Sequence, residues 1–342
     1  MRYKKDFFRE VLKDVACKVY EGFYKDQKAV VFESDALLFK FLPEFGGNLA
    51  SAFDKNTGRE FMVQRPETHY RVVPFDGAYT EGECCGMDDM FPTIDICYYE
   101  KEPWAGVKLA DHGEIWNLKA ETTLRKDGAA FVFHGVRLPY VLEKNIRFLS
   151  DTVLRIDYKL HNPTQFDMYF LWAAHTMLNA EPGLRILVPD DLKKAVAVFS
   201  NTERIGKYGE EFDWPAYTDK DGTRRKIDVM GERDLNCEKY YFKEALQKGW
   251  CAAQYPDNTV FALSFPAEKV PYLGILHNLG SFRGIYNLFL EPCTAPFDRP
   301  DFAAARGQCS KAAAKSVYEW YLNITVENVI SVKGMEENGR PV

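Results

Sequence analysis

Residues 154–160 read Leu-Arg-Ile-Asp-Tyr-Lys-Leu, a strict alternation of apolar and charged or polar side chains. Successive side chains of a β-strand point to opposite faces of a sheet, so this segment has one apolar face and one face suited to water. Strands of this kind are typical of antiparallel sheets that pack on a core with one side only. The stretch therefore predicts a strand in an antiparallel sheet.

The neighbouring segments continue the pattern. Runs rich in β-branched and aromatic residues end at turn signals such as Lys126-Asp127-Gly128, Ser150-Asp151 and Asn162-Pro163. We predict further strands over these ranges: Ala29–Glu33, Ala36–Phe41, Ala130–His134, Val136–Leu142, Leu142–Leu149, Val153–His161, Met168–Ala174, Val260–Phe265, Tyr272–Leu276, Ile285–Leu290 and Val317–Val326. Many strands with few long helical patterns indicate an all-β sandwich or barrel.

Helical patterns are few and short. Apolar residues at helical spacing predict an N-terminal helix over about residues 4–16, and a run of alanines predicts another over Asp301–Ala314. From about residue 190 to 248 the strand pattern weakens, and a loop-rich segment of this length is usually functional or mobile. Because no repeat or linker divides the chain, we interpret residues 1–342 as a single domain.

The composition argues against several classes of protein. Lys and Arg number 44 against 50 Asp and Glu, a formal net charge of -6, whereas a nucleic-acid partner requires a basic stripe. The N-terminal stretch lacks the apolar segment of a signal peptide, and no run approaches the roughly 18 apolar residues that cross a bilayer. We expect a cytoplasmic protein without a membrane partner, and we leave open whether it forms a homodimer.

The eight cysteines are scattered along the chain. They show neither the density of a disulfide-stapled domain nor the spacing of a zinc site. We interpret even the adjacent Cys84 and Cys85 as ordinary thiols. The sequence therefore predicts reduced cysteines and no metal ion.

The six histidines differ in their surroundings. His112 lies in Asp-His-Gly-Glu-Ile-Trp-Asn, residues 111–117, a mixture that suits a ligand-binding loop better than a core. Its glycine lets the backbone approach a ligand closely, and Trp116 can stack on the apolar face of a sugar ring. Structural roles are expected for three histidines that lie in or beside strand patterns without polar companions: His69, His134 and His161.

Three other polar residues follow apolar runs at the expected ends of buried strands: His175, His277 and Glu291. A carboxylate in such a place is partly desolvated, which raises its pKa toward that of a useful general base. From the residues alone, each of the three also has a structural alternative, either a satisfied core histidine or an ion pair at a strand end.

Several segments, taken in chain order, resemble the aldose 1-epimerase family and its relatives in the galactose mutarotase-like superfamily. Residues 42–51, Leu-Pro-Glu-Phe-Gly-Gly-Asn-Leu-Ala-Ser, followed by Thr-Gly-Arg-Glu at 57–60, resemble the early strand, paired glycines and Thr-Gly turn of the family. Residues 86–93, Gly-Met-Asp-Asp-Met-Phe-Pro-Thr, are similar to a segment of the relatives. The resemblance covers most of the chain.

The same resemblance extends to candidate site residues. His112-Gly113 is similar to the first active-site His-Gly of the family, and His175 to the second histidine. Glu291-Pro292 resembles the late strand that carries the catalytic glutamate. The resemblance implies a large antiparallel β-sandwich, the supersandwich of that superfamily, and a mutarotase that interconverts the α and β anomers of an aldose without a cofactor.

In that mechanism Glu291 is the base, His175 the acid, and His112 a hydrogen-bonding partner of the sugar. We expect these substrate-binding residues: Asp88, Asp89, Glu114, Trp116, Trp172, Asn179 and His277. An anionic group on the sugar would find a cation at Arg71, Arg283 or Lys239.

Two other functions stay open at this point. A carbohydrate-binding or sensing protein without turnover is compatible with the same fold, because folds outlive their chemistry. A glycan-cleaving lyase or hydrolase is the other, since glycoside hydrolysis uses two carboxylates, which Glu291 with Glu114 or Asp88 would supply.

Overall fold

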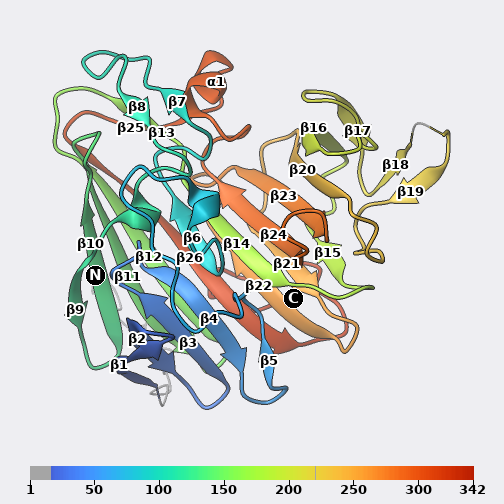
Figure 1. Cartoon of the computed structure of the whole chain (residues 1–342), viewed down its shortest axis with the longest axis horizontal. Coiled ribbons are helices and arrows are strands. Elements are labelled where there is room, and N and C mark those ends of the chain that lie inside the picture. The colour runs from blue at the N-terminus through green and yellow to red at the C-terminus, as the bar shows by residue number, and fades with distance from the viewer. Residues whose placement is uncertain (1–16, 220) are drawn as a thin grey trace, which may run out of the picture.

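The structure is a computed structural model that describes residues 17–219 and 221–342. The helix expected over residues 4–16 lies outside these ranges. Two large antiparallel sheets dominate the described chain, as Figure 1 shows. The prediction of an all-β sandwich is therefore confirmed.

The larger sheet has twelve strands. Eleven of them follow one another across the sheet in this spatial order: β1 (Lys18–Tyr24), β2 (Gln27–Glu33), β3 (Leu37–Leu42), β4 (Asn48–Asp54), β6 (Met87–Met90), β14 (Ala173–Asn179), β24 (Tyr286–Cys293), β23 (Tyr272–Leu279), β20 (Cys237–Phe242), β16 (Lys194–Ser200) and β17 (Glu211–Asp213). The short β5 (Arg59–Glu60) pairs with β4. Strands from the first, middle and last thirds of the chain thus meet at the centre of this sheet, where β6, β14 and β24 are neighbours.

The second sheet has eight strands. Their spatial order is β15 (Arg185–Leu187), β21 (Trp250–Gln254), β22 (Thr259–Ser264), β26 (Ser316–Asn328), β12 (Val153–Asn162), β11 (Val141–Ser150), β10 (Gly128–His134) and β9 (Glu121–Leu124). Three small pairs complete the β structure: β7 (Cys97–Tyr98) with β8 (Lys108–Leu109), β13 (Met168–Phe170) with β25 (Ser310–Ala312), and β18 (Ala216–Thr218) with β19 (Arg224–Lys226).

Helices are short in the described ranges. They are the 3-10 turns η1 (Tyr79–Glu81) and η2 (Ile115–Asn117) and the α-helix α1 (Pro300–Ala305). None of the helices in residues 17–219 and 221–342 is long and apolar enough to span a membrane.

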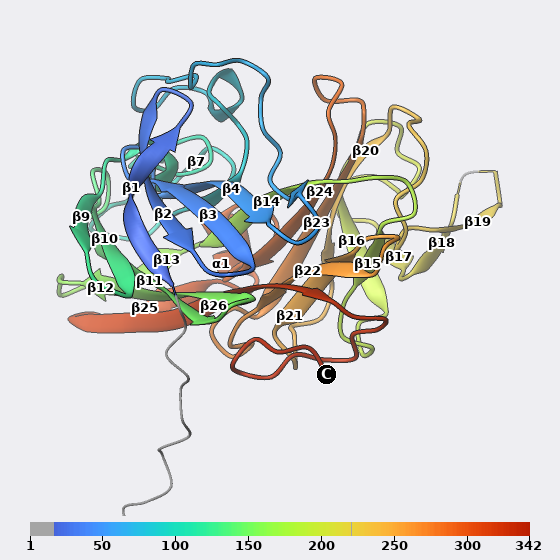
Figure 2. The same cartoon turned by 90° about the horizontal axis from the view of Figure 1, so that it is seen from below.

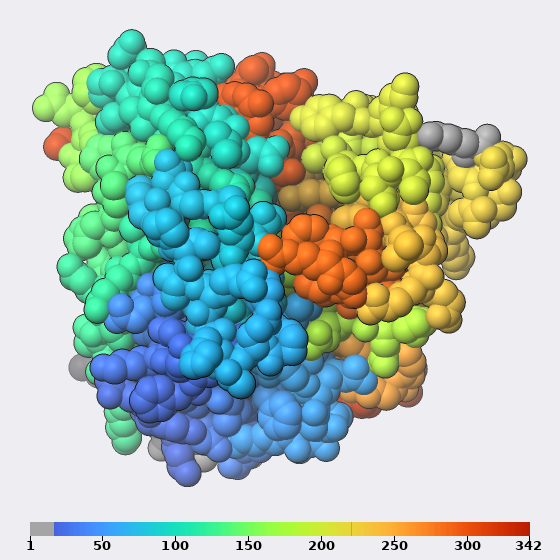
Figure 3. All heavy atoms as spheres, viewed as in Figure 1, coloured from blue at the N-terminus to red at the C-terminus, as the bar shows by residue number. Residues whose placement is uncertain are grey.

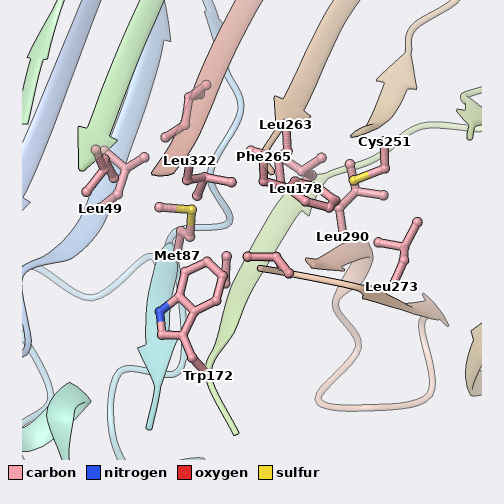
Figure 4. Close-up of a cluster of buried hydrophobic side chains, with 14 of the residues drawn as sticks. Leu49, Met87, Trp172, Leu178, Cys251, Leu263, Phe265, Leu273, Leu290 and Leu322 are labelled. Atoms are coloured by element: carbon pink, nitrogen blue, oxygen red, sulfur yellow. The ribbon is translucent and has the colours of Figure 1, made fainter. Parts of the chain in front are cut away.

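The core fills the space between the two large sheets. On β12 the burial alternates as predicted, with Leu154, Ile156, Tyr158 and Leu160 inside and the charged residues between them at the other face. Figure 4 shows side chains of both sheets meeting in this layer, together with Trp172 from the connection between β13 and β14. We call the face of the twelve-stranded sheet that meets the core the inner face, and the opposite one the outer face.

Loops cover the outer face. Figure 2 shows the connections before β6 and around β7 and β8 on the side of the twelve-stranded sheet away from the eight-stranded one. Under them lies a second apolar cluster that includes Tyr79, Met90, Trp116 and Phe289. Side chains on the outer face are therefore buried by loops and not by a sheet.

Most predicted strands are confirmed, but Val136–Leu142 is not a strand over most of its length, because β11 begins only at Val141. The carboxylate of the buried Glu114 accepts hydrogen bonds from the amides of Val136 and Arg137, and Gly135 donates to Tyr140. These amides are no longer free to join a ladder, so the chain turns here.

Two other ranges need correction. The run Met168–Ala174 is divided between β13 and β14, which belong to different sheets. The helix expected over Asp301–Ala314 ends at Ala305, and residues 310–312 form β25 against β13. A partner strand for these residues outweighs their helix propensity.

The segment of about residues 190–248 is also more regular than expected. It contains β16 and β20, which are consecutive members of the twelve-stranded sheet, as well as β17, β18 and β19. The run Lys239-Tyr240-Tyr241-Phe242 in β20 is rich in aromatic residues, and this strand signal was missed.

Candidate functional site

A row of residues crosses the outer face of five adjacent strands. Asp88 on β6 pairs with His175 on β14, and the pairings on either side of them place His175 opposite Glu291 on β24. Glu291 pairs with Gly274 on β23, which pairs with Tyr241 on β20. Directly opposed residues on neighbouring strands have Cβ atoms about 5 Å apart. Register alone therefore brings these groups side by side, although they are far apart in the sequence.

We had expected His175 at the end of a strand, but it lies within β14. Its exposed fraction is 5%. Its Nε2 atom is 3.6 Å from Oε1 of Glu291, and its Nδ1 atom is 3.4 Å from the hydroxyl of Tyr79. Burial, with the charges of His112 and Lys239, holds the pKa of His175 well below its usual value. The resting imidazole is therefore neutral.

Glu291 also lies inside its strand, because β24 continues to Cys293, and the residue is fully buried. Neither oxygen has a hydrogen-bond donor of good geometry, but Oε2 forms an ion pair with Nζ of Lys239 at 2.8 Å, whereas Oε1 faces Nε2 of His175 at 3.6 Å. The distance to His175 is too long for a hydrogen bond. Burial raises the pKa of Glu291 even though Lys239 opposes that shift.

Gly274 makes room for this carboxylate. A Cβ atom there would stand 3.2 Å from Oε2 of Glu291 and 3.0 Å from the ring of Tyr241. A larger residue would push both side chains away. The glycine in Tyr272–Leu276 is thus a sequence signal for a crowded site, and we missed it.

Lys239 and Asp298 complete the buried charge cluster. Nζ of Lys239 lies 2.7 Å from Oδ1 of Asp298, which also accepts a hydrogen bond of 2.5 Å from the hydroxyl of Tyr241. Burial by itself would lower the pKa of Lys239, but the carboxylates of Asp298 and Glu291 outweigh it and raise that pKa. Because it is committed to two carboxylates, Lys239 is not available to an anionic sugar, contrary to one of our expectations.

His112 approaches the row from the loop before η2. Its ring stacks on that of Tyr79 with centroids 4.2 Å apart, and it stands edge-on to His175 at 5.3 Å. Asp111 orients both partners, since its carboxylate lies 2.8 Å from Nδ1 of His112 and accepts the amide of Tyr79 at 2.8 Å.

The glycine after His112 is required by packing. Gly113 has φ +76°, and a Cβ atom there would lie 2.1 Å from the carbonyl oxygen of Phe91. We had expected this glycine to let the backbone approach a ligand. Instead, it lets the backbone approach the main chain of Phe91. Gly113 therefore presses the His112 loop against the segment that follows β6.

Asp88 is buried beside His175 and carries two hydrogen bonds. Its carboxylate accepts from the hydroxyl of Tyr79 at 2.8 Å and from the amide of Asn48 at 2.8 Å. Burial outweighs these bonds and raises the pKa of Asp88 to about 6. Tyr79 thus connects Asp88, His175 and His112, and nothing in its sequence context singled it out.

Trp116 supports this arrangement from behind. Its indole donates to the carbonyl of Asp111 at 3.0 Å, and its ring stands edge-on to Tyr79 at 5.1 Å. It is 9% exposed, so its position favours holding the loop over offering a broad face to a ligand.

Two expected binding residues lie on the inner face. Asp89, next to Asp88 on β6, points into the core, where Lys144 of β11 lies 2.5 Å away and the indole of Trp172 donates at 2.8 Å. Trp172 itself is fully buried against Tyr158. We therefore correct the expectation that Asp89 and Trp172 line the site.

Three further expected binding residues lie elsewhere. Glu114 is occupied by backbone amides and by the hydroxyl of Tyr140 at 2.7 Å. Asn179, at the far end of β14, donates to the carbonyls of Glu60 and Met62. His277 points to the inner face, 3.2 Å from the hydroxyl of Tyr240, and burial lowers its pKa to about 3. The structure does not bring these residues to the row.

The remaining candidate cations lie in loops. Arg71 lies 3.7 Å from Glu67 near the surface, and Arg283 stands over the ring of Phe282 at 5.2 Å. These contacts tie Arg71 and Arg283 to residues outside the row.

All eight cysteines are free, and burial raises the pKa of Cys84 to about 12. No group of three or more potential metal ligands gathers among residues 17–219 and 221–342.

The surface is hollowed over this part of the molecule. Figure 3 shows the recess between the orange-red segment around α1, the cyan loops before η2 and the yellow-green segment between β16 and β17. His112 and Asp111, with side chains 18% and 23% exposed, are the least buried members of the site. These two residues are therefore the part of the site nearest to the solvent.

Comparison with known proteins yields structural neighbours only. No family model and no curated protein sequence matches the chain. Among solved structures, a galactose mutarotase-like protein from Clostridium acetobutylicum is similar over 92% of this chain and 99% of its own, at 15% identity and a TM-score of 0.64. A galactose mutarotase-like protein from Lactobacillus casei matches over 87% and 100%, at 14% identity and a TM-score of 0.64.

A protein provisionally named an aldose 1-epimerase, from Klebsiella pneumoniae, covers 90% of this chain and 83% of its own at 12% identity, with a TM-score of 0.64. At such identities the likeness concerns the fold. The superfamily resemblance read from the sequence is confirmed at that level.

Proposed function

Because the chain has the galactose mutarotase-like fold, we propose that it is a sugar 1-epimerase of the mutarotase kind, which interconverts the α and β anomers of an aldose or modified aldose. One observation carries the proposal. Glu291 is a fully buried carboxylate whose oxygens lack a hydrogen-bond donor of good geometry, and its Oε1 faces the buried His175. An unsatisfied buried carboxylate is rare and calls for a functional explanation.

The reaction needs one base and one acid. Glu291 takes the proton from the anomeric hydroxyl while protonated His175 gives a proton to the ring oxygen, so that the bond between C1 and the ring oxygen breaks and the aldehyde forms. After rotation about the bond between C1 and C2, the hydroxyl group formed from the ring oxygen attacks the other face of C1. Its proton returns to His175, and Glu291 returns its proton to the anomeric oxygen. Atoms and charges balance without a cofactor.

Burial suits both groups to these roles. The raised pKa of Glu291 makes its carboxylate a stronger base, and the lowered pKa of His175 makes its imidazolium a stronger acid. Because burial disfavours both charged forms, only a small fraction of molecules has Glu291 ionised and His175 protonated at the same time.

His112 and Asp88 flank the reacting pair. His112, oriented by Asp111, is positioned to hydrogen-bond a sugar hydroxyl at the entrance. Asp88 acts through Tyr79, whose hydroxyl lies between the carboxylate and His175. For His112 this is the hydrogen-bonding role expected from the sequence, whereas Asp88 is here proposed to position His175 and not to bind the sugar.

The test is saturation-transfer NMR of freshly dissolved aldoses with catalytic amounts of protein. The panel contains neutral hexoses, hexose 6-phosphates, a 6-sulfonate and uronic acids. Faster anomer exchange for one member, reduced roughly a hundredfold or more in Glu291→Gln, is the expected result. No acceleration with any sugar, or full activity in Glu291→Gln, would contradict the proposal. Ligand-induced shifts without exchange would indicate a carbohydrate-binding protein.

A further inference from the structure

Glu291 does not stand alone but forms the end of a buried chain of charges. Nζ of Lys239 lies between two carboxylates, 2.8 Å from Glu291 and 2.7 Å from Asp298. Lys239 and Asp298 are 6% and 4% exposed. They come from β20 and from the turn after β24, so the fold brings them to Glu291 from two directions.

The contacts divide the two oxygens of Glu291 between two tasks. Oε2 faces Lys239, and Oε1 is left to face His175. A lysine ammonium that binds one oxygen fixes the orientation of the whole carboxylate. The reactive oxygen is therefore aimed by a contact made on the opposite side of the group.

Charge balance explains the second carboxylate. When Glu291 takes up a proton it becomes neutral, and an ammonium paired with it alone would be left uncompensated in a buried site, which is strongly unfavourable. Asp298 stays bound to Lys239 in either state, and the hydroxyl of Tyr241 supports the same oxygen. The cluster can thus accept a proton at Glu291 without stranding a buried charge.

Resting on the proposed function, we infer that Lys239 and Asp298 are positioning residues of the proton transfer. Lys239 orients Glu291 and keeps it ionised, and Asp298 holds the charge of Lys239 in the site after Glu291 has been protonated. The two residues act on the base in opposite senses. Removing the positive one makes Glu291 easier to protonate, whereas removing the negative one makes it harder.

Other ionisable groups around Glu291 keep their identity in these variants, although Lys239 and Asp298 also act on the pKa values of some of them. These groups are His175 on β14, Tyr241 on β20, Cys293 on β24 and His112 in the loop before η2. Tyr241 loses its acceptor oxygen only in part when Asp298 becomes asparagine, because the amide oxygen can still accept.

The experiment follows Glu291 directly, without a substrate. Protein labelled with ¹³C at the glutamate carboxyl carbons is titrated by NMR, and the Glu291 signal is identified by its absence in Glu291→Gln. The titration is repeated in Lys239→Met and Asp298→Asn. Lys144→Met is the matched control, because Lys144 is also a buried lysine and is paired with Asp89 on the inner face.

The midpoint for Glu291 is expected to move to higher pH in Lys239→Met, to lower pH in Asp298→Asn, and to stay in Lys144→Met. An unchanged midpoint in both site variants, or movement in the same direction, would overturn the inference. If Lys239→Met does not fold, Asp298→Asn decides alone: a lower midpoint supports the inference, and an unchanged or higher one refutes it. Since no sugar is present, this result is independent of whether any aldose reacts.

Discussion

The two faces of β6 carry adjacent carboxylates with different surroundings. Asp89 points to the inner face and meets the ammonium of Lys144 and the indole of Trp172. Asp88 points to the outer face, where neutral groups, the hydroxyl of Tyr79 and the amide of Asn48, are its hydrogen-bond donors. Neighbours in the sequence thus belong to two separate polar clusters.

The comparison extends to the two buried lysines. Lys144 binds Asp89 and also donates to the carbonyl of Gly47, and the cluster ties the two sheets together. Lys239 forms an ion pair with only one oxygen of Glu291, and the other oxygen faces His175 at 3.6 Å. Buried ionic groups that are fully paired indicate a structural role, whereas an unpaired oxygen opposite a histidine indicates chemistry. Four changes would break or sharpen this distinction.

The largest effect is expected at the inner cluster. Asp89→Asn should lower the free energy of unfolding by about 3–5 kcal/mol, because it leaves the buried ammonium of Lys144 without a counter-charge. Guanidinium chloride denaturation followed by circular dichroism measures the loss. Asp88→Asn is the matched control on the other face, with an expected loss of about 1 kcal/mol. Equal losses in the two variants would remove the distinction.

Gly274→Ala tests how tightly the outer cluster is packed. The added methyl group would crowd Oε2 of Glu291 and the ring of Tyr241, so we expect a loss of about 1–3 kcal/mol in stability and a lower rate of anomer exchange. Gly231→Ala is the control, since nothing lies within 4 Å of its Cβ position. A stability and a rate like those of the control would show that the site has spare room.

His277→Gln tests the histidine of the inner face through pH. The folded pKa is lowered to about 3, so the unfolded chain takes up a proton that the folded one refuses as the pH falls below about 6.5. The stabilising contribution is therefore present above that value and is lost toward acid. Between about pH 6 and pH 5 the parent should lose about 1 kcal/mol more than the variant in urea denaturation. Parallel pH profiles would contradict this assignment.

The smallest effect on stability is expected at Glu291. In Glu291→Gln the ammonium of Lys239 keeps Asp298 at 2.7 Å, so no buried charge is stranded. The free energy of unfolding should change by about 1 kcal/mol or less, even though the rate of anomer exchange falls strongly. Thermal denaturation measures it, and a loss as large as that of Asp89→Asn would mean that Glu291 is mainly structural.

The strands could be read from the sequence where the pattern is local. The alternation in residues 154–160 is visible without any partner, and β12 follows it. Val136–Leu142 shows the limit, because a carboxylate from Glu114 takes the amides that would form the ladder. Such a long-range partner leaves no trace in the segment itself.

The site could be predicted only in part. Resemblance and context pointed to His112, His175 and Glu291, and the structure brings His175 beside Glu291 and His112 edge-on to His175. The same reasoning selected Asp89, which strand alternation turns to the other face, and Trp172, whose indole meets Asp89 there. A run of polar residues does not reveal which of them faces a ligand.

The amino-acid sequence by itself determined the all-β architecture and most of its strands, because alternation and turn residues act over a few positions. Tertiary structure alone decided the composition of the site. Lys239, Asp298 and Tyr79 join Glu291 and His175 through strand order, register and loop packing, which depend on pairings between distant segments. A one-residue shift in any of these registers would turn a site residue into the core.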